Sequence, residues 1–469
     1  MTQPFDNTLN STEAHKRYQR PFYGLTSDYN YCEKHRAFFA NNPEYVFTQK
    51  NFVTSYSGPI IRKTVLGGLG NDIHPEISDK AKNVAPTDEA AIQMRSDTSL
   101  IVTIGEMFYY RQINTQFSCL GQMSDHIPGH DSLYRKDYAT RNILNYVKGY
   151  ESRPQCLDAG RFFPKTFALR NPQQCKEFFK IFNSEEYEKL KAERGIVYFR
   201  KVGADAHGAE GVFPVDDQEK IHINTLYQNG KLCGQNKANN LLQHYIYNPL
   251  LLNDKKFDFR VFMLVASSNP FIVYYHDGFL RVSLTEYDPV NNSQNSLMPN
   301  HEANDEIIRR ARANGTLNGK TVQQIKEDYM WSFERLEKYL LENGKIEDPN
   351  WLENYLRPEL KKAMVHIIRM SQFGFQKISS VYELYGVDFI LDENLNLWFI
   401  EANSRPAIEG ITAFSKELFT QLYWDQYEIV FAVLRSRMKR VYEYVNKMIF
   451  RGEALLRANG EVNVAKALV

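Results

Sequence analysis

Hydrophobic and polar residues alternate along several short segments of the chain, a pattern typical of strands with one buried face. The predicted strands are Ser99–Thr103, Ile196–Arg200, Phe257–Ala266, Phe271–His276 and Phe279–Leu284. The dipeptide Asp277-Gly278 separates the last two and favours a tight turn between antiparallel strands. A second hairpin is predicted over Tyr385–Ile400.

Apolar residues at helical spacing predict helices over Lys176–Glu193, Thr321–Glu342, Pro358–Gln372 and Ala413–Arg457. The segment Asp125–Arg141 opens with a Pro-Gly turn and then becomes helical in pattern. Strands and helices mixed in this order predict an α/β or α+β fold.

Composition and charge narrow the possible partners. Of 469 residues, 43% are hydrophobic and 24% charged, which is typical of a globular protein with two to four domains. The 57 Lys and Arg nearly balance the 56 Asp and Glu, so an overall basic surface for nucleic acid is absent, although a local patch stays open. No apolar run is long enough for a membrane span, and the start MTQPFDNTLNS resembles no signal or transit peptide. We therefore expect neither nucleic acid nor membrane as a partner.

The cysteines are few and scattered, without a CxxC pair. They are Cys32, Cys119, Cys156, Cys175 and Cys233. Their odd number and irregular spacing predict free thiols in a reducing cytosol and argue against a zinc site.

The segment GVDFILDENLNLWFIEANSRP carries a candidate metal site. If residues 393–396 form its loop, Asp392 pairs with Leu397 and Asp388 faces Glu401 across the hairpin. Asn403 lies two residues beyond Glu401 and points the same way. Three such oxygen ligands suit Mg²⁺ holding nucleotide phosphates. The alternative is a hairpin with solvated acids at its ends, and a loop of another length would change the register.

The strand KKFDFRVFMLV places Lys256, Asp258 and Arg260 on one face. Two cations around one acid indicate an anion site with an orienting carboxylate. The alternative is an edge strand kept soluble by its charges. Arg281 follows in GFLRVSL, where it is either a ligand or a surface residue.

Lys201 ends a predicted strand, and glycines 203, 208 and 211 follow it. A lysine beside such a loop can cover nucleotide phosphates, with backbone N–H groups as donors. The segment is no P-loop, because no GK[ST] follows. Residues 241–252, LLQHYIYNPLLL, offer backbone groups to an adenine edge or form a plain core strand.

In order and spacing these segments resemble the tubulin–tyrosine ligase-like family. The resemblance rests on Lys201 with its glycine loop, QHYIYNPLLL, KFDFRVFMLV, YHDGFLR and the D-x12-E-x-N element, and upstream on DHIPGHDSLYRKD and FFPKTFAL. It covers roughly residues 100–410 and implies an α+β, ATP-grasp fold. It also implies an ATP- and Mg²⁺-dependent ligase that joins a free amino acid to glutamate side chains of tubulin tails. The stretches FMLVASSNPFIVYYHDGFLRVSLTEYD and GPIIRKTVL resemble the glycylase-type members, so we expect glycine as the donor.

The resemblance also assigns roles to individual residues. Metal ligands are Asp388, Glu401 and Asn403; nucleotide ligands are Lys201, Gln243, Tyr245, Ile246, Lys256 and Asp258; catalytic residues are Arg260, Arg281 and Glu401. It implies four parts: an extension at 1–50, an N-terminal α/β domain at 51–165, the ATP-grasp lobes at 166–410 and a helical tail at 411–469. The implied location is the cytoplasm and cytoskeleton, including the cilium or axoneme.

Three departures from the family pattern keep a second function open. Val202 replaces the usual Pro, the glycine loop reads HGAEGV, and LMPN replaces the common HLTN. The second hypothesis is therefore a catalytically weak or inactive member that acts as a structural ciliary or microtubule-associated protein. A third is a small-molecule carboxylate–amine ligase on the same fold, which the N-terminal signatures disfavour.

The predicted tail helix carries an apolar stripe at Leu434, Met438, Val441, Val445 and Met448. Seven basic and two acidic residues lie between Val433 and Arg457. The basic excess is either a surface for acidic tubulin tails or the ordinary solvated face of a docked helix.

Overall fold

The computed structural model describes most of the chain beyond residue 122. The described residues are 123–151, 159–202, 211–237, 239–288, 301–315, 319–377, 381–404 and 412–458, with short segments at 52–55, 64–65, 68, 72–73, 102–104, 406, 408 and 410. Side chains are described up to residue 436 of the last helix. The predicted extension at 1–50, glycines 203 and 208, and the LMPN segment lie outside these residues.

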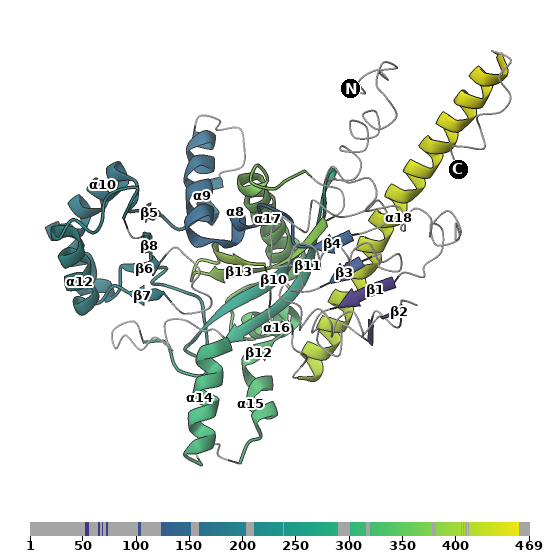
Figure 1. The fold of residues 1–469 in the computed structure, drawn as a ribbon. Helices are drawn as coiled ribbons and strands as arrows, with labels where there is room; N and C mark the ends of the chain where they lie inside the picture. Colours follow the sequence, from purple (N-terminus) through teal and green to yellow (C-terminus); the bar gives the residue numbers. More distant parts are fainter. Residues whose placement is uncertain are drawn as a thin grey trace.

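A large mixed sheet forms the centre of the structure (Figure 1). Its strands run in the order β12-β11-β10-β13-β4-β3-β1-β2, with β14 added to β13 and β9 to β10. They are β1 (Phe52–Ser55), β2 (Asp72–Ile73), β3 (Val102–Ile104), β4 (Met123–Asp125), β9 (Leu251–Leu252), β10 (Lys255–Ser268), β11 (Phe271–Val282), β12 (Met330–Trp331), β13 (Val381–Leu391) and β14 (Leu397–Asn403). Strand β3 overlaps the predicted strand at Ser99–Thr103.

The prediction of a turn at Asp277-Gly278 is wrong. Strands β10 and β11 form one long hairpin whose turn lies at Asn269-Pro270, and Asp277-Gly278 lies inside β11. The pairing shifts between Arg260 and Phe262, so the dipeptide accommodates a β-bulge. A Cβ atom on Gly278 would lie 1.7 Å from the carbonyl oxygen of Arg260, so this close backbone approach requires glycine.

The hairpin of β13 and β14 brings Asp388 opposite Glu401, as predicted, although its loop is longer than expected. Leu391, and not Asp392, pairs with Leu397. A register shift between Asp388 and Phe389 adds one residue to β14 and restores the predicted pairing.

A second, four-stranded antiparallel sheet lies to one side of the large sheet and carries helices on one face (Figure 1). Its strands, in the order β5-β8-β6-β7, are β5 (Thr166–Ala168), β6 (Tyr198–Val202), β7 (Val212–Pro214) and β8 (Asn240–His244). Its helices are α10 (Pro172–Phe182), α11 (Glu185–Arg194) and α12 (Asp217–Gln228).

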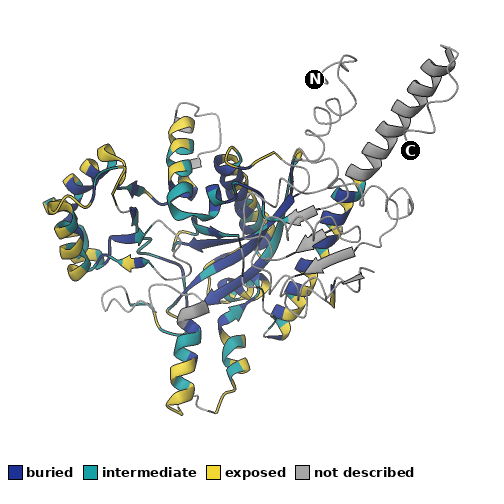
Figure 2. Cartoon of the chain, viewed as in Figure 1, coloured by how far each residue is buried: buried dark blue, intermediate teal, exposed yellow. Residues whose placement is uncertain are grey.

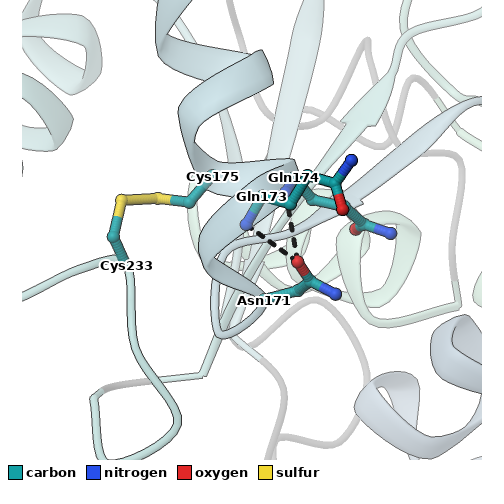
Figure 3. The surroundings of a disulfide bond; sticks show 5 residues. All are labelled: Asn171, Gln173, Gln174, Cys175 and Cys233. Atoms are coloured by element: carbon teal, nitrogen blue, oxygen red, sulfur yellow. Dashed lines mark hydrogen bonds between the residues drawn. A yellow bond between two sulfur atoms is a disulfide. The ribbon is translucent and has the colours of Figure 1, made fainter.

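The single helix predicted over Lys176–Glu193 is in fact two helices, α10 and α11. Ser184 begins α11, since its side chain accepts a hydrogen bond from the backbone N–H of Tyr187. Asn171 caps α10 in the same way, accepting from the N–H groups of Gln173 and Gln174 (Figure 3).

The prediction that all cysteines are free thiols is wrong for one pair. A disulfide joins Cys175 in α10 to Cys233 after α12 (Figure 3). The two residues are 58 positions apart in sequence, and only the packing of α10 beside the loop after α12 brings their Cα atoms within 5.4 Å. The other three cysteines lie outside the described residues.

Helices cover both faces of the large sheet. The helices are α8 (Asp131–Tyr134), α9 (Lys136–Glu151), η3 (Ala159–Phe162), α14 (His301–Ala313), α15 (Val322–Tyr329), α16 (Phe333–Glu342), η4 (Leu352–Leu356), α17 (Arg357–Ser371) and α18 (Ala413–Ala458). The main core packs α16 and α17 against β10 and β13, and α18 packs on the other face (Figure 2).

The helix predicted over Thr321–Glu342 is interrupted by β12, whereas α17 and α18 confirm the other two predictions. In α18, Phe419, Tyr423, Tyr427 and Leu434 are buried, so the apolar stripe begins earlier than predicted. The stripe residues after Leu434 lie where side chains are not described. Among the described helices, none is both long and apolar enough to span a membrane.

We predict that Gly278→Ala destabilises the chain, because its methyl group must displace the backbone at Arg260. Overpacking of this kind typically costs about 1–3 kcal/mol. Gly149→Ala is the matched control, since a Cβ atom added there in helix α9 would meet no atom of another segment within 4 Å. Urea unfolding of both variants measures the difference. Equal stability of Gly278→Ala and wild type would contradict the bulge.

Candidate functional site

Two buried arginines, the buried Asp388 and the partly buried Asp258 lie together on β10, β11 and β13. Asp258 is paired with Arg281 across β10 and β11, and Arg260 with Asp388 across β10 and β13. Directly opposed residues share a sheet face, so all four side chains meet. Strand β10 is thus central and not an edge strand, and Arg281 is only 7% exposed, so the surface alternatives are wrong for both.

The contacts within this network are bidentate. Nε and Nη2 of Arg281 donate to the two carboxylate oxygens of Asp258, both at 2.7 Å. Arg260 grips Asp388 in the same manner, with Nη2 donating to Oδ2 at 2.8 Å. Nη2 of Arg281 also lies 3.0 Å from Oδ2 of Asp388, which joins the two pairs.

The pKa values of the two aspartates are shifted in opposite directions. Burial alone would raise the pKa of Asp388, but Arg260 and Arg281 outweigh it and hold that pKa below its usual value. For Asp258 burial, helped by the nearby charge of Asp388, prevails over Arg281 and Arg260 and raises the pKa. Asp388 is therefore the more firmly ionised carboxylate.

The structure brings the three predicted metal ligands into neighbouring positions. Asp388 is opposite Glu401, and Asn403 is opposite Gly386. The Asn403 side-chain amide donates to Oε1 of Glu401 at 3.2 Å. Carboxylate and amide oxygens fit a hard cation such as Mg²⁺, and each carboxylate oxygen of Asp388 has a second lone pair beyond its arginine contact. Their metal-binding role stays a prediction.

The two predicted nucleotide lysines are both desolvated by burial, and they lie close enough for their charges to interact. Burial lowers the pKa of Lys201 to about 8, although Glu401 partly offsets this. Burial lowers the pKa of Lys256 to about 7; Asp258 partly offsets this, and the nearby Lys201 lowers it further. Two cations that are costly to keep charged would be stabilised by a bound anion.

Lys201 and Glu401 line a narrow cleft between the small and large sheets. Gln243 and Lys136 line the same cleft. It follows that residues from β6, β8, β14 and α9 share one space, even though they are scattered over more than 260 positions of the sequence.

The predicted adenine hinge borders a cavity of about 360 Å³. Tyr245 and Ile246 line it, together with Trp398 and Arg194. The Gln243 side chain instead donates to the hydroxyl of Thr166 at 3.1 Å, so it ties β8 to β5.

Sequence reasoning missed several residues of this region. The Tyr245 hydroxyl accepts a hydrogen bond from Lys256 and donates to the hydroxyl of Tyr287, at 3.1 and 3.0 Å. Tyr287 follows β11 without any pattern that would have marked it. Lys136 belongs to the RKD element at residues 135–137, and its charge lowers the pKa of Lys201. Gly211 has φ of 74°, and its carbonyl accepts from the N–H of Val202, so it closes the described end of the glycine loop.

Comparison with known proteins identifies the class. A sequence profile of the Tubulin-tyrosine ligase family matches residues 114–440. The chain belongs to this family, and its mixed helices and antiparallel sheets form the ATP-grasp-like fold, as predicted.

Individual relatives are mostly longer proteins. The chain is 24% identical to the protein polyglycylase TTLL10 of Macaca fascicularis over 326 residues, 66% of this chain and 48% of that protein. It is 24% identical to the inactive polyglycylase TTLL10 of Homo sapiens over 306 residues, 62% and 42% of the two chains. It is 30% identical to tubulin glycylase 3A of Drosophila melanogaster over 195 residues, which cover 41% of this chain and 18% of that protein. The chain thus spans about half the length, or less, of these curated relatives.

The low pKa of Lys256 predicts a pH-dependent stability. An unfolded lysine keeps its proton up to about pH 10.5, whereas folded Lys256 loses it near pH 7. Between these values the unfolded state binds more protons, so the free energy of unfolding rises with pH. Lys256→Met should reduce this rise between pH 7 and pH 9 in urea unfolding of the ligand-free chain. The exposed Lys180→Met should keep the wild-type slope, and an unchanged slope in Lys256→Met would refute the pKa assignment.

Proposed function

We propose that this chain is an ATP-dependent ligase that joins an amino acid to glutamate side chains of tubulin tails. The observation that carries the proposal is the buried network of Arg260, Asp388, Arg281 and Asp258 beside Lys201 and Lys256. Such a concentration of cations, with carboxylates that orient them, suits phosphate and carboxylate ligands.

The chemistry follows from the poor reactivity of a carboxylate toward amines. Phosphoryl transfer from ATP converts the acceptor carboxylate into an acyl phosphate, whose leaving group is phosphate and no longer oxide. The amine of the free amino acid then attacks the acyl carbon, and an isopeptide bond, ADP and phosphate result. Mg²⁺, when bound by Glu401, Asn403 and Asp388, supplies charge neutralisation on the phosphates.

Different residues of the chain take different roles in this reaction. Lys201 and Lys256 bind nucleotide phosphates, and Tyr245 and Ile246 border the adenine cavity. In Arg260 and Arg281 the ion pairs use Nε and Nη2. The Nη1 group of each then contacts the transferring phosphoryl or the carboxylate of the incoming amino acid. Asp258 and Asp388 position the two guanidinium groups.

Glycine is the proposed donor, tubulin the proposed acceptor, and the cytoplasmic cytoskeleton, including cilia, the proposed location. The support is the resemblance of residues 262–288 to glycylases and the names of two relatives, a polyglycylase and a tubulin glycylase. The basic end of α18 adds a charge attraction for acidic tails.

A structural, catalytically weak role is the second candidate. It is favoured by one relative, the human TTLL10, which is named an inactive polyglycylase. The LMPN segment and the first four residues of HGAEGV fall outside the described residues, so geometry adds nothing to this candidate there.

The full chain, incubated with ATP, Mg²⁺, microtubules and labelled glycine, should incorporate label into tubulin. Glu401→Gln should abolish incorporation, since it removes one charge with little change in volume, while the exposed Glu347→Gln should keep wild-type activity. Faster incorporation of glutamate than glycine would overturn the donor and keep the ligase class. No incorporation of any amino acid, with no ATP binding, would favour the structural role.

We also predict that Lys201→Ala weakens nucleotide binding at least about tenfold, the equivalent of roughly 1.4 kcal/mol. The reason is the loss of a cation from the desolvated cleft that Lys201 shares with Glu401. Calorimetric titration with ADP and Mg²⁺ measures the effect, and exposed Lys180→Ala is the control. An affinity equal to that of wild type would remove Lys201 from the phosphate site.

A further inference from the structure

Two histidines and one glutamate converge at a place that the ligase reaction does not use. His126 and His130 flank the Pro-Gly turn between β4 and α8, and Glu383 lies near the start of β13. Nδ1 of His126 lies 2.9 Å from Oε1 of Glu383, and Nδ1 of His130 lies 3.1 Å from Oε2. The Glu383 side chain is only 1% exposed, and the two histidines are 14% and 11% exposed.

From this geometry we propose that His126, His130 and Glu383 bind one divalent transition-metal ion of the zinc class. Two imidazoles and one carboxylate are a donor set that zinc takes in proteins, with a water in the fourth position. Imidazole nitrogens favour such borderline metals over Mg²⁺. The cysteine pattern argued against zinc, but no cysteine takes part in this set.

The spacing of the donor atoms suits one small ion. The three ligand atoms lie within 4.8 Å of one another. Zinc bonds of about 2.0–2.2 Å at tetrahedral angles place ligand atoms about 3.3 Å apart. Small side-chain rotations therefore complete the site without movement of the backbone.

His130 supplies an independent observation. Its Nδ1 atom is buried and, within the described residues, makes no directed hydrogen bond, despite lying close to Glu383. A buried polar atom in this state is costly unless something binds it. A metal ion on the Nδ1 side would satisfy this nitrogen, while Oε2 of Glu383 keeps its hydrogen bond from the N–H of Ile127.

The surroundings hold the ligands in place. The backbone N–H of Ile127 donates to Oε2 of Glu383 at 2.8 Å. Asp125 lies 3.7 Å from Nε2 of His126, where an orienting carboxylate typically supports a metal-bound histidine. His126 has φ of 68°, and Gly129 has φ of 85° with Gly374 directly against it, so the turn has one tightly fixed conformation.

The proposed ion has a structural role. It joins the turn before α8 to β13, the strand that also carries Asp388 five residues later. It thereby braces the segment that precedes α9 against the strand that holds the ligase site.

The test is zinc and cobalt binding by the full chain after treatment with a chelator. Calorimetric titration with zinc chloride should give one site that persists in Glu401→Gln, which separates it from the proposed Mg²⁺ ligands. Cobalt(II) should give the intense visible absorption of four-coordinate sites. His130→Ala should weaken zinc binding more than about 100-fold, and Asp125→Asn by about 10–100-fold. His222→Ala, on the exposed face of α12, should bind as wild type does.

The proposal is overturned if wild type binds no zinc, since the cluster is then a hydrogen-bonded clamp of two histidines on one carboxylate. It is also overturned if His130→Ala, with a wild-type circular dichroism spectrum, binds zinc equally well. Because wild type itself is the primary measurement, a variant that fails to fold leaves the test intact.

Discussion

The mutual neutralisation of two arginines and two aspartates inside the large sheet is the constraint on which the site depends. Three of the four charges are buried and Asp258 is partly buried. Removal of one partner from a buried pair typically costs about 3–5 kcal/mol because the other is left uncompensated. The partners are opposed residues of β10, β11 and β13, so the strand register and the charge network are one constraint. A slip of one residue would turn every member to the opposite face.

In this network the aspartates orient the arginines, whereas the lysines of the site are held differently. Asp258 and Asp388 each hold a guanidinium group in a bidentate grip, which fixes its plane. For Lys201 and Lys256, burial outweighs the attraction of Glu401 and Asp258, and it lowers the pKa of both. The site thus combines oriented arginines with poorly solvated lysines, whose charged forms a bound anion would stabilise.

The alternation of residues along the hairpin correctly predicted that Asp388 faces Glu401, although the assumed loop length was wrong. The assumed four-residue loop and the actual longer loop differ by one position, and the bulge beside Phe389 cancels the difference. A bulge adds one residue to one strand of a pair and shifts the alternation of faces there, and no residue type beside Phe389 marks its position. The same limit produced the error at Asp277-Gly278, where glycine serves a close backbone approach and not a turn.

Contacts between segments that are distant in sequence could not be predicted from local patterns. The contact of Lys256 with Tyr245, and of Tyr245 with Tyr287, joins three segments through side chains only. The Cys175–Cys233 bond likewise depends on how α10 packs beside a distant loop. By contrast, the break between α10 and α11 had a readable sign, because Ser184 followed by two glutamates is a favourable helix start.

The low pKa of Lys256 also couples anion binding to proton uptake. A lysine with a pKa of about 7 is partly neutral near pH 7 when no anion is bound. An anion beside it favours the ammonium form, so each anion that enters draws a fraction of a proton from the solvent, and each that leaves returns it. Occupancy of the cleft is therefore linked to the acidity of its surroundings, and alkaline conditions weaken anion binding even where every contact in the bound state is unchanged.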